Sequence, residues 1–472
     1  MTQTPELLSL SAHELVGWFR SKKTSPVEVL NELKRHADGI NPSINAFLAF
    51  HWEDAAASAR LSADRWQKDS PLGDLDGVPV TIKDHVAVSG WTSRNGTIVS
   101  DPAVRASIDA PAVARLKESG AVLFGQTTMP EFGWKGTGDS TLTGSTRNPW
   151  NLAKTAGGSS SGAAAAVATG LGPLAVGTDG GGSIRIPCAF TGIFGLKASG
   201  GRVPYWPPSQ NGTLTHLGPM TRTVRDAAIM LNVLAGPDLR DWSSLPYDPV
   251  DFTRDLDSFP SNIKIAFSMD LGFGRIASDV AEVVDAAIHR LRGDGVAIAD
   301  RDPGFSDPTE WFNVLWKAGM ASNTRTYDAQ MLTKLDPGLQ NLIEQGRHST
   351  AMDYTAALSE RVSLGSLLKQ FSQDFPILLS PVTCTTAFDV GRVVPPGYSE
   401  ESPVSPFLTH PFNATTQPAA SVPIGLTKDG MPVGLQVVGP MYRDDLVLKV
   451  ARRIERSISD IDRTPILPNQ GA

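Results

Sequence analysis

A buried strand, a short helix and a second buried strand follow one another between residues 78 and 124, and this succession constrains the fold most. Apolar residues alternate through 78–83, which leaves Lys83 on the opposite face near the strand's end. A helix is predicted over 111–119, where a glycine follows, and 121–124 is predicted as the next strand. Strands that alternate with helices favour an α/β fold, in which helices cover both faces of a sheet.

Helix caps predict the helical segments. Capping boxes begin at Ser11 and Ser25, so residues 11–38 are predicted to form a helical hairpin at the N-terminus. Residues 279–292 have the pattern of an amphipathic helix, with Ser278 as the expected cap. The N-terminal part of the chain is therefore expected to be helical.

The second half begins after a stretch rich in Asp, Pro and Ser at 236–262, which we interpret as a surface connection. Further strands are predicted at 263–267 and 377–379. The last ten residues, 463–472, lack periodicity and are expected to fray.

Composition argues against several classes of protein. The net charge is -7 and no dense run of Lys or Arg occurs, which argues against nucleic acid as a partner. Two cysteines and eight scattered histidines give no disulfide framework and no metal site, and no cofactor is expected. The sequence lacks a secretory leader pattern and an apolar run of about 18 residues, so we expect a cytoplasmic protein without membrane segments.

Glycine, serine and alanine dominate residues 155–197, which carry almost no charge. A flexible loop before a buried Ala-rich helix would explain one such cluster, but here two clusters flank a strand. Backbone N–H groups of Gly180, Gly181 and Gly182 can converge on one developing negative charge. Ser183 follows directly and is placed to attack the carbonyl whose oxygen these groups hold, as acyl transfer requires.

The base and the nucleophile each have alternatives in the sequence. His85 and His216 are the nearest histidines to Ser183, and spacing favours neither, so the base stays open from spacing alone. Ser160 lies at the centre of a G-x-S-x-G match, but the polar segment before it does not predict the strand that a nucleophile elbow requires. Cys188 is interpreted as a core residue.

Several motifs in a fixed order resemble the amidase signature family, and the resemblance covers nearly the whole chain. Ser159 and Ser183 lie 24 residues apart, the spacing that family members keep. The motifs are GVPVTIKD at 77–84, GGSSSG at 157–162, GTDGGGSIRIP at 177–187, GLK at 195–197, LGPMTRTVRDA at 217–227 and PAASVPIGLTKDGMPVGLQVVGP at 418–440.

The resemblance implies a large mixed sheet and a serine hydrolase that cleaves carbon–nitrogen bonds of amide type. By it, Ser183 corresponds to the nucleophile, Ser159 to a relaying serine preceded by a cis peptide bond, and Lys83 to the base. Lys83 can accept a proton only when neutral, so burial must lower its pKa by several units. Asp84 must then point away from Lys83, as strand alternation predicts.

The substrate pocket is less well defined by the sequence. Gly133 and Trp134 resemble part of the substrate channel of fatty acid amide hydrolases, although Trp134 is equally well explained as core. Trp311, Phe312 and Trp316 stand at helical spacing. If some of them line the cleft, aryl amides, anilides or aryl carbamates would fit better than short aliphatic amides.

The expected activity is that of a stand-alone amidase or carbamate hydrolase with a small-molecule substrate. An amidase subunit of a glutamine-dependent amidotransferase and a non-catalytic scaffold are the alternatives. The resemblance is compatible with a homodimer, but no interface is readable. We expect one amidase domain over 1–472, made of an N-terminal helical part (1–70), a catalytic core (71–235), a surface connection (236–262) and a second half that completes sheet and substrate pocket (263–472).

Overall fold

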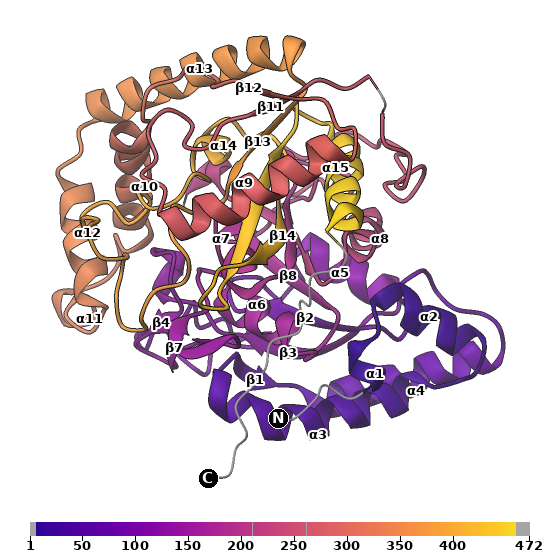
Figure 1. Ribbon diagram of the computed structural model, residues 1–472. Helices are drawn as coiled ribbons and strands as arrows, with labels where there is room; N and C mark the ends of the chain where they lie inside the picture. The colour runs from indigo at the N-terminus through magenta and orange to yellow at the C-terminus, as the bar shows by residue number, and fades with distance from the viewer. Residues whose placement is uncertain (1–5, 210, 261, 459–472) are drawn as a thin grey trace.

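The computed structural model describes residues 6–209, 211–260 and 262–458, and these form a large mixed sheet covered by helices (Figure 1). Within them the sheet has 11 strands in the order β1-β3-β2-β8-β10-β9-β14-β15-β13-β11-β12. The strands are β1 (Phe47–Phe50), β2 (Pro79–Lys83), β3 (Val122–Thr127), β8 (Leu174–Asp179), β9 (Phe194–Lys197), β10 (His216–Thr221), β11 (Ile265–Phe267), β12 (Ile298–Asp300), β13 (Ile377–Pro381), β14 (Ala419–Leu426) and β15 (Pro432–Val438).

Parallel and antiparallel pairings alternate across the sheet in blocks. β2 lies parallel to both β3 and β8, whereas the strands from β8 through β10, β9, β14 and β15 to β13 pair antiparallel. At the far edge, β13, β11 and β12 are parallel again. The predicted α/β class with a large mixed sheet is therefore confirmed.

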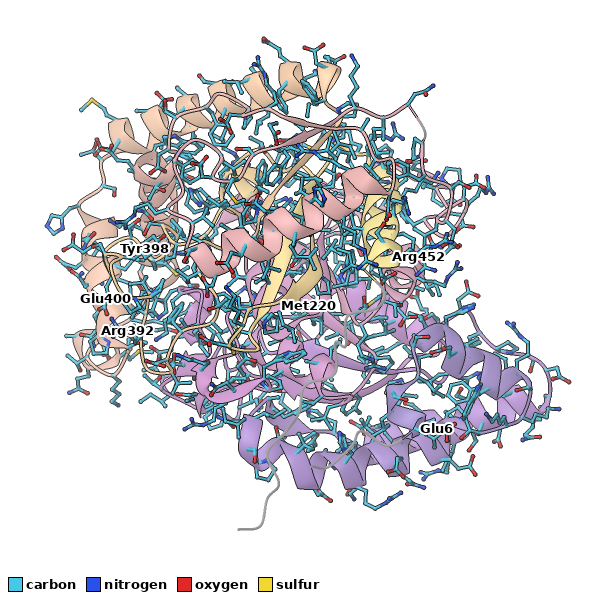
Figure 2. The ribbon with its side chains drawn as sticks, in the orientation of Figure 1. Glu6, Met220, Arg392, Tyr398, Glu400 and Arg452 are labelled. Carbon is cyan, nitrogen blue, oxygen red and sulfur yellow. The ribbon has the colours of Figure 1, made fainter. Side chains whose placement is uncertain are left out.

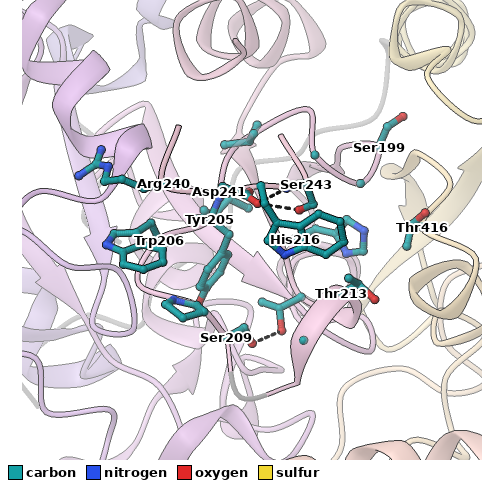
Figure 3. Close-up of a pocket in the computed structure, with 18 of the residues that line it drawn as sticks. Ser199, Tyr205, Trp206, Ser209, Thr213, His216, Arg240, Asp241, Ser243 and Thr416 are labelled. Atoms are coloured by element: carbon teal, nitrogen blue, oxygen red, sulfur yellow. Dashed lines mark hydrogen bonds between the residues drawn. The ribbon is translucent and has the colours of Figure 1, made fainter. Parts of the chain in front are cut away.

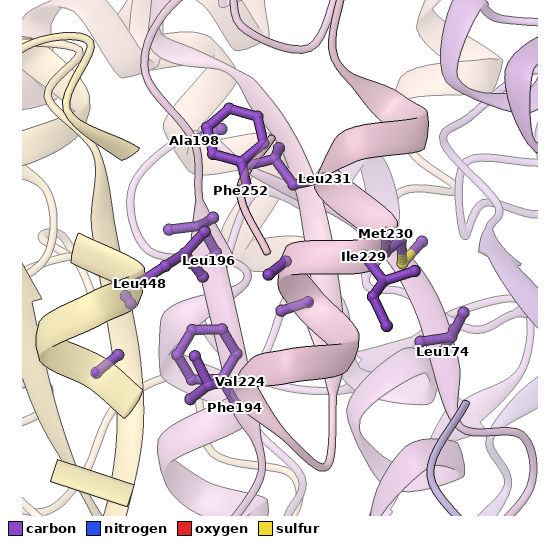
Figure 4. Packing of buried hydrophobic residues seen from close by; sticks show 14 of the residues in the cluster. Leu174, Phe194, Leu196, Ala198, Val224, Ile229, Met230, Leu231, Phe252 and Leu448 are labelled. Carbon is purple, nitrogen blue, oxygen red and sulfur yellow. The ribbon is translucent and has the colours of Figure 1, made fainter. Parts of the chain in front are cut away.

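Helices pack on the two faces of this sheet. Alternate residues of β8 belong to different core clusters: Leu174 and Val176 pack in the largest cluster, which contains α5, α8, α9 and α15, whereas Ala175 packs against α6 and α7. Figure 4 shows the first of these clusters around α8. The helices are α1 (Glu6–Ser9), α2 (Ala12–Arg20), α3 (Pro26–Ile44), α4 (Trp52–Gln67), α5 (Pro111–Glu118), α6 (Ser161–Ala168), α7 (Arg185–Thr191), α8 (Val224–Leu234), α9 (Ser278–Gly293), α10 (Thr309–Asn323), α11 (Ala329–Leu332), α12 (Pro337–Arg347), α13 (Ala351–Asp374), α14 (Pro411–Ala414) and α15 (Asp444–Ser457), with 3-10 turns η1 (Glu131–Gly133) and η2 (Gly212–Leu214).

The helix caps agree in part with the predicted ones. Both predicted capping boxes form, at Ser11 before α2 and at Ser25 before α3. The cap predicted at Ser278 is wrong, because Ser278 is the first residue of α9 and Ala277 takes the cap position without a side-chain hydrogen bond. The predicted fraying tail, 463–472, lies outside the described residues.

The predicted surface connection falls between α8, which ends at Leu234, and β11, which begins at Ile265. Its described residues form no helix or strand, and several are exposed, among them Leu239 and Trp242. In the side-chain view of Figure 2, Met220 of β10 lies in the interior while Glu6 and Arg452 lie toward the outside. No helix in the described part of the chain is long and apolar enough to cross a bilayer.

Candidate active site

Lys83 is the last residue of β2, which lies between β3 and β8 in the sheet. Its side chain is fully buried. Its Nζ lies 2.7 Å from Ser159 Oγ, 3.0 Å from Ser160 Oγ and 2.8 Å from Thr178 Oγ1. Burial lowers the pKa of Lys83 to about 7, against the opposing charges of Asp179 and Asp84. A substantial fraction of this amine is therefore neutral at physiological pH.

The two serines that contact Lys83 lie in the turn between β7 (Asn151–Thr155) and α6. The Gly158–Ser159 peptide bond is cis, as the resemblance implies. Only glycine fits at 158, because a Cβ atom there would collide with the carbonyl oxygen of Thr137. Ser160 stands at the N-cap position of α6 without a side-chain capping bond, and its amide donates to the carbonyl oxygen of Ser183 at 3.1 Å. The serine turn is thus joined to the neighbouring nucleophile turn.

Ser183 lies in the second glycine-rich turn, which leads from the end of β8 into α7. Its side chain is 7% exposed and lines a small pocket together with Ser159, Gly133 and His85. A Cβ atom at Gly133 would approach Ser159 Oγ to 2.9 Å, so glycine there keeps the space beside this hydroxyl open. The structure therefore brings Ser159, Ser183 and Gly133 to one pocket, with Lys83 behind it.

The backbone amides around Ser183 have different surroundings. The Gly182 amide donates to Asp179 Oδ1 at 2.7 Å and is therefore occupied. Within the described ranges, the amides of Gly180, Gly181 and Ser183 have no hydrogen-bond acceptor. Gly182 has a φ of 131°, and a side chain there would collide with Thr409. The Ile184 amide donates to Asp179 Oδ2 at 3.2 Å, so three of the five amides between β8 and α7 are free to bind an oxyanion.

A buried network of charged and polar side chains stabilises this turn. The Asp179 carboxylate accepts from Arg185 Nε and Nη2, both at 3.0 Å, and from Asn413 Nδ2 at 2.8 Å. Burial alone would raise the pKa of Asp179, but the Arg185 guanidinium holds it well below its usual range. Arg185 also donates to Gln436 Oε1 at 2.7 Å and to the Thr409 carbonyl at 3.0 Å.

Sequence reasoning missed this network. Asp179 and Arg185 were a readable signal, because they are the charged residues inside the GTDGGGSIRIP motif of an almost uncharged stretch. Their partner Asn413 lies more than 200 residues away and has no local signal. Ser160 and Thr178 were missed as partners of Lys83 for the same reason.

Asp84 points away from Lys83, as expected. Its carboxylate accepts from the amides of Arg94 and Gly96 and from Gln126 Nε2, each at 2.8 Å. Burial raises the pKa of Asp84 to about 6, even though these two backbone amides favour the charged form. The Asp84 carboxylate therefore has hydrogen-bond partners other than the Lys83 amine.

The predicted wall residues are distributed between pocket and core. Trp316 lines the pocket, as do Met129 and Phe132, which the sequence did not single out. Trp134 is 1% exposed, and its indole packs in an apolar cluster with α10 and α12. Phe312 is fully buried in the same cluster, whereas Trp311 is partly buried at its edge.

The alternative nucleophiles have other environments. Ser160 follows a short strand, β7, that pairs with β6 (Arg147–Asn148) and forms an isolated bridge to Asp389, both outside the large sheet, so the polar segment before Ser160 forms a small ladder. Cys188 is buried in α7, and burial raises the pKa of its thiol well above the ordinary value.

His85, a candidate base in the sequence, lines the pocket, and burial lowers its pKa to about 4. Among the described residues no cluster of His, Cys, Asp and Glu could hold a metal ion.

Comparisons with known proteins cover nearly the whole chain. A family model described as Amidase matches residues 28–448. An acylamidase of Rhodococcus erythropolis is 34% identical over 463 residues, 97% of each chain. A glutamyl-tRNA(Gln) amidotransferase subunit of Geobacter metallireducens is 30% identical over 482 residues, 96% of this chain and 98% of the relative. The crystal structure of a bacterial aryl acylamidase of the amidase signature enzymes superposes with a TM-score of 0.89 at 30% identity, covering 95% of this chain and 96% of that one.

Proposed function

This chain belongs to the amidase signature family and is an amidase, and from that premise we propose that it cleaves amides through an acyl-enzyme on Ser183. One observation carries the proposal. The buried Lys83 amine lies 2.7 Å from Ser159 Oγ, and Ser159 shares a pocket with Ser183. An amine with a pKa of about 7 can act as a base at neutral pH, and the serine between can pass the proton.

Lys83 is held in the orientation that a base requires. A neutral amine has two N–H bonds and one lone pair, and Lys83 has three partners. The Ser160 hydroxyl donates its own proton to the Thr178 carbonyl at 3.1 Å, so its oxygen accepts from Lys83. With Thr178 Oγ1 accepting the second N–H, the lone pair is left for the proton of Ser159.

The proposed cycle starts from neutral Lys83. It takes the Ser159 proton while Ser159 takes the Ser183 proton, and Ser183 Oγ forms a bond to the substrate carbonyl carbon. The free amides of Gly180, Gly181 and Ser183 stabilise the oxyanion. The relay returns the proton to the amide nitrogen as the carbon–nitrogen bond breaks, because an unprotonated amine is a poor leaving group. Water then hydrolyses the acyl-enzyme by the same relay.

The substrate class that we propose is an uncharged aryl amide. Met129, Phe132 and Trp316 give the pocket apolar walls. No carboxylate, lysine or arginine is among its described lining residues, so a zwitterionic acyl donor such as glutamine would lack charged partners there. The similarity to an acylamidase and to an aryl acylamidase supports the same choice. Aryl carbamates are the second candidate, because they present the same carbonyl and ring.

A role within an amidotransferase is the alternative that the relative from Geobacter metallireducens favours. The chain purified alone should hydrolyse acetanilide. A chain inactive alone, and active on glutamine only with a partner protein and tRNA, would establish the alternative instead.

Labelling with a fluorophosphonate tests the nucleophile. We expect the wild type to be labelled and Ser183→Ala to be unlabelled, while Cys188→Ser keeps the label as the control for the cysteine. Labelling that persists in Ser183→Ala and disappears in Ser160→Ala would assign the nucleophile to the G-x-S-x-G turn. A folded wild type that is not labelled would favour the alternative of a non-catalytic scaffold protein.

A further inference from the structure

The catalytic pocket leaves little free space beside the reacting groups. Its cavity volume is about 20 Å³, which is room for about one water molecule. A methyl group is similar in size to a water molecule. The pocket therefore has room for the carbonyl of a substrate and one small substituent, but not for a long chain on its enclosed side.

The side chains that line the pocket divide into a buried apolar group and a partly exposed polar group. The buried group is Met129, Phe132 and Trp316, and the partly exposed group is His85, Asn211 and Thr215. The first group forms the inner wall of the pocket and the second forms its rim. At the rim, Thr215 also lines a larger cavity of about 320 Å³, where its hydroxyl lies 2.8 Å from Ser209 Oγ (Figure 3). Further space thus lies beyond the rim.

Trp316, on α10, closes the inner wall and is held at both ends of its indole. Its Nε1 donates to the Trp134 carbonyl oxygen at 3.2 Å, and its ring stacks on that of Phe312 with the centroids 6.1 Å apart. Its six-membered ring lies against the nucleophile turn, where a Cβ atom at Gly180 would stand 3.0 Å from Trp316 Cζ3. The missing side chain at Gly180 is what allows the indole to lie so close to this turn.

The order of the proposed reaction assigns the two sides of the pocket. The amine leaves first and water then enters, whereas the acyl group stays bonded to Ser183 between these steps. The amine must therefore face the rim, through which it can leave. The acyl substituent then faces the inner wall, which Trp316 closes.

We propose that Trp316 is a specificity-determining residue, which limits the acyl group of the substrate to about the size of acetyl. The amine side, which faces the rim, is not subject to this limit. The inference rests on the proposed acyl-enzyme at Ser183, and it adds a preference for acyl size that the catalytic residues do not explain.

The test varies the length of the acyl chain on two leaving groups. The 4-nitrophenyl esters and the anilides of acetic, propionic and butyric acid form the two series. In the wild type, kcat/KM should fall by at least about 10-fold from acetyl to butyryl in both series. In Trp316→Ala, the ratio of butyryl to acetyl kcat/KM should rise by at least about 10-fold, because the space of the indole becomes free.

A third series lengthens the amine side instead. The ratio of kcat/KM for 4'-butylacetanilide to that for acetanilide should be the same in Trp316→Ala as in the wild type, because the added chain faces the rim. A gain as large in this series as in the acyl series would show that Trp316 does not act on the acyl group, and would overturn the assignment.

Two further variants provide the controls. Trp311→Ala removes an indole from the same helix that is not among the described residues lining the pocket, and it should leave all ratios unchanged. Trp316→Phe keeps a smaller aromatic ring and should raise the butyryl ratio less than Trp316→Ala does. If Trp316→Ala does not fold, Trp316→Phe replaces it, and its butyryl ratio should still exceed that of the wild type.

The esters separate this inference from the proposed substrate class. A wild type that hydrolyses acetyl and butyryl esters equally well, or a Trp316 variant that keeps the wild-type ratio, overturns the acyl limit and leaves the amidase mechanism intact. Esters that show the expected ratios while no anilide is hydrolysed would support the acyl limit and overturn the aryl amide substrate. A folded chain that hydrolyses neither series would overturn both.

Discussion

At the scale of the residue, the central feature is an amine buried near two carboxylates without forming an ion pair with either. Asp179 is occupied by Arg185 and Asn413, and Asp84 by backbone amides and Gln126. Both carboxylates raise the pKa of Lys83, but burial outweighs them. The site can therefore keep a lysine partly neutral because its potential counter-ions have other partners.

The first prediction concerns pH. Only neutral Lys83 accepts a proton, and the neutral fraction increases as pH rises through a pKa of about 7. The kcat/KM for acetanilide should therefore rise through about pH 7 and level off above it. A pH–rate profile from 5 to 9 checks this. A profile that is flat, or that falls across this range, would contradict the role of Lys83 as base.

The second prediction concerns the leaving group. Lys83→Met removes the base and, with it, the group that returns a proton to the leaving amine of the substrate. Anilide hydrolysis should therefore fall by about 10²–10⁴-fold. An activated ester such as 4-nitrophenyl acetate needs no proton on its leaving group and should lose less. Steady-state kinetics on both substrates measures the difference. Equal losses would argue against the relay.

At the scale of the element, the site depends on where strands end. β2 ends at Lys83 and β8 ends at Asp179, and the two strands are parallel neighbours, so the base and the nucleophile turn emerge at one edge of the sheet. The helices need only local signals to begin correctly. α3 starts at a capping box in which Ser25 and Glu28 bond each other's backbone amides.

The third prediction concerns that cap. Ser25→Ala leaves one amide of the first turn of α3 without an acceptor and should lower the free energy of unfolding by about 0.5–2 kcal/mol. Activity should be unchanged at a temperature where the protein is folded. Urea denaturation measures the effect, with Ser363→Ala on the exposed face of α13 as control, expected within about 0.5 kcal/mol of the wild type. Equal effects in both variants would contradict the capping assignment.

At the scale of the whole molecule, the two halves of the chain are joined through the sheet and through the network below Ser183. β9 of the first half pairs with β14 of the second. Arg185 is fully buried and links Asp179 to Asn413 and Gln436. The nucleophile turn is therefore held by residues from the far half of the sequence.

The fourth prediction concerns this junction. Arg185→Met leaves Asp179 buried without its cation, which should cost about 3–5 kcal/mol of stability. Activity should fall with it, since Asp179 binds the Gly182 amide beside Ser183. Arg292→Met, which breaks an exposed pair with Asp300, is the control and should cost at most about 1 kcal/mol. Urea denaturation of both variants measures the difference, and similar midpoints would contradict the structural role of Arg185.

Local pattern was sufficient for much of the fold. The helix caps at Ser11 and Ser25, the strand that ends at Lys83 and the α/β class follow from short-range chemistry, because side-chain period and capping act within a few residues. The motifs around Lys83, Ser159 and Ser183 also named the family. The division of the chain into four parts and the catalytic roles of Lys83, Ser159 and Ser183 remain predictions.

Tertiary structure decided what surrounds these residues. Ser160 and Thr178 reach Lys83 across 77 and 95 positions, and Asn413 reaches Asp179 across 234. The sequence does not indicate which of these residues are partners, because contacts over such separations depend on strand order and not on local spacing.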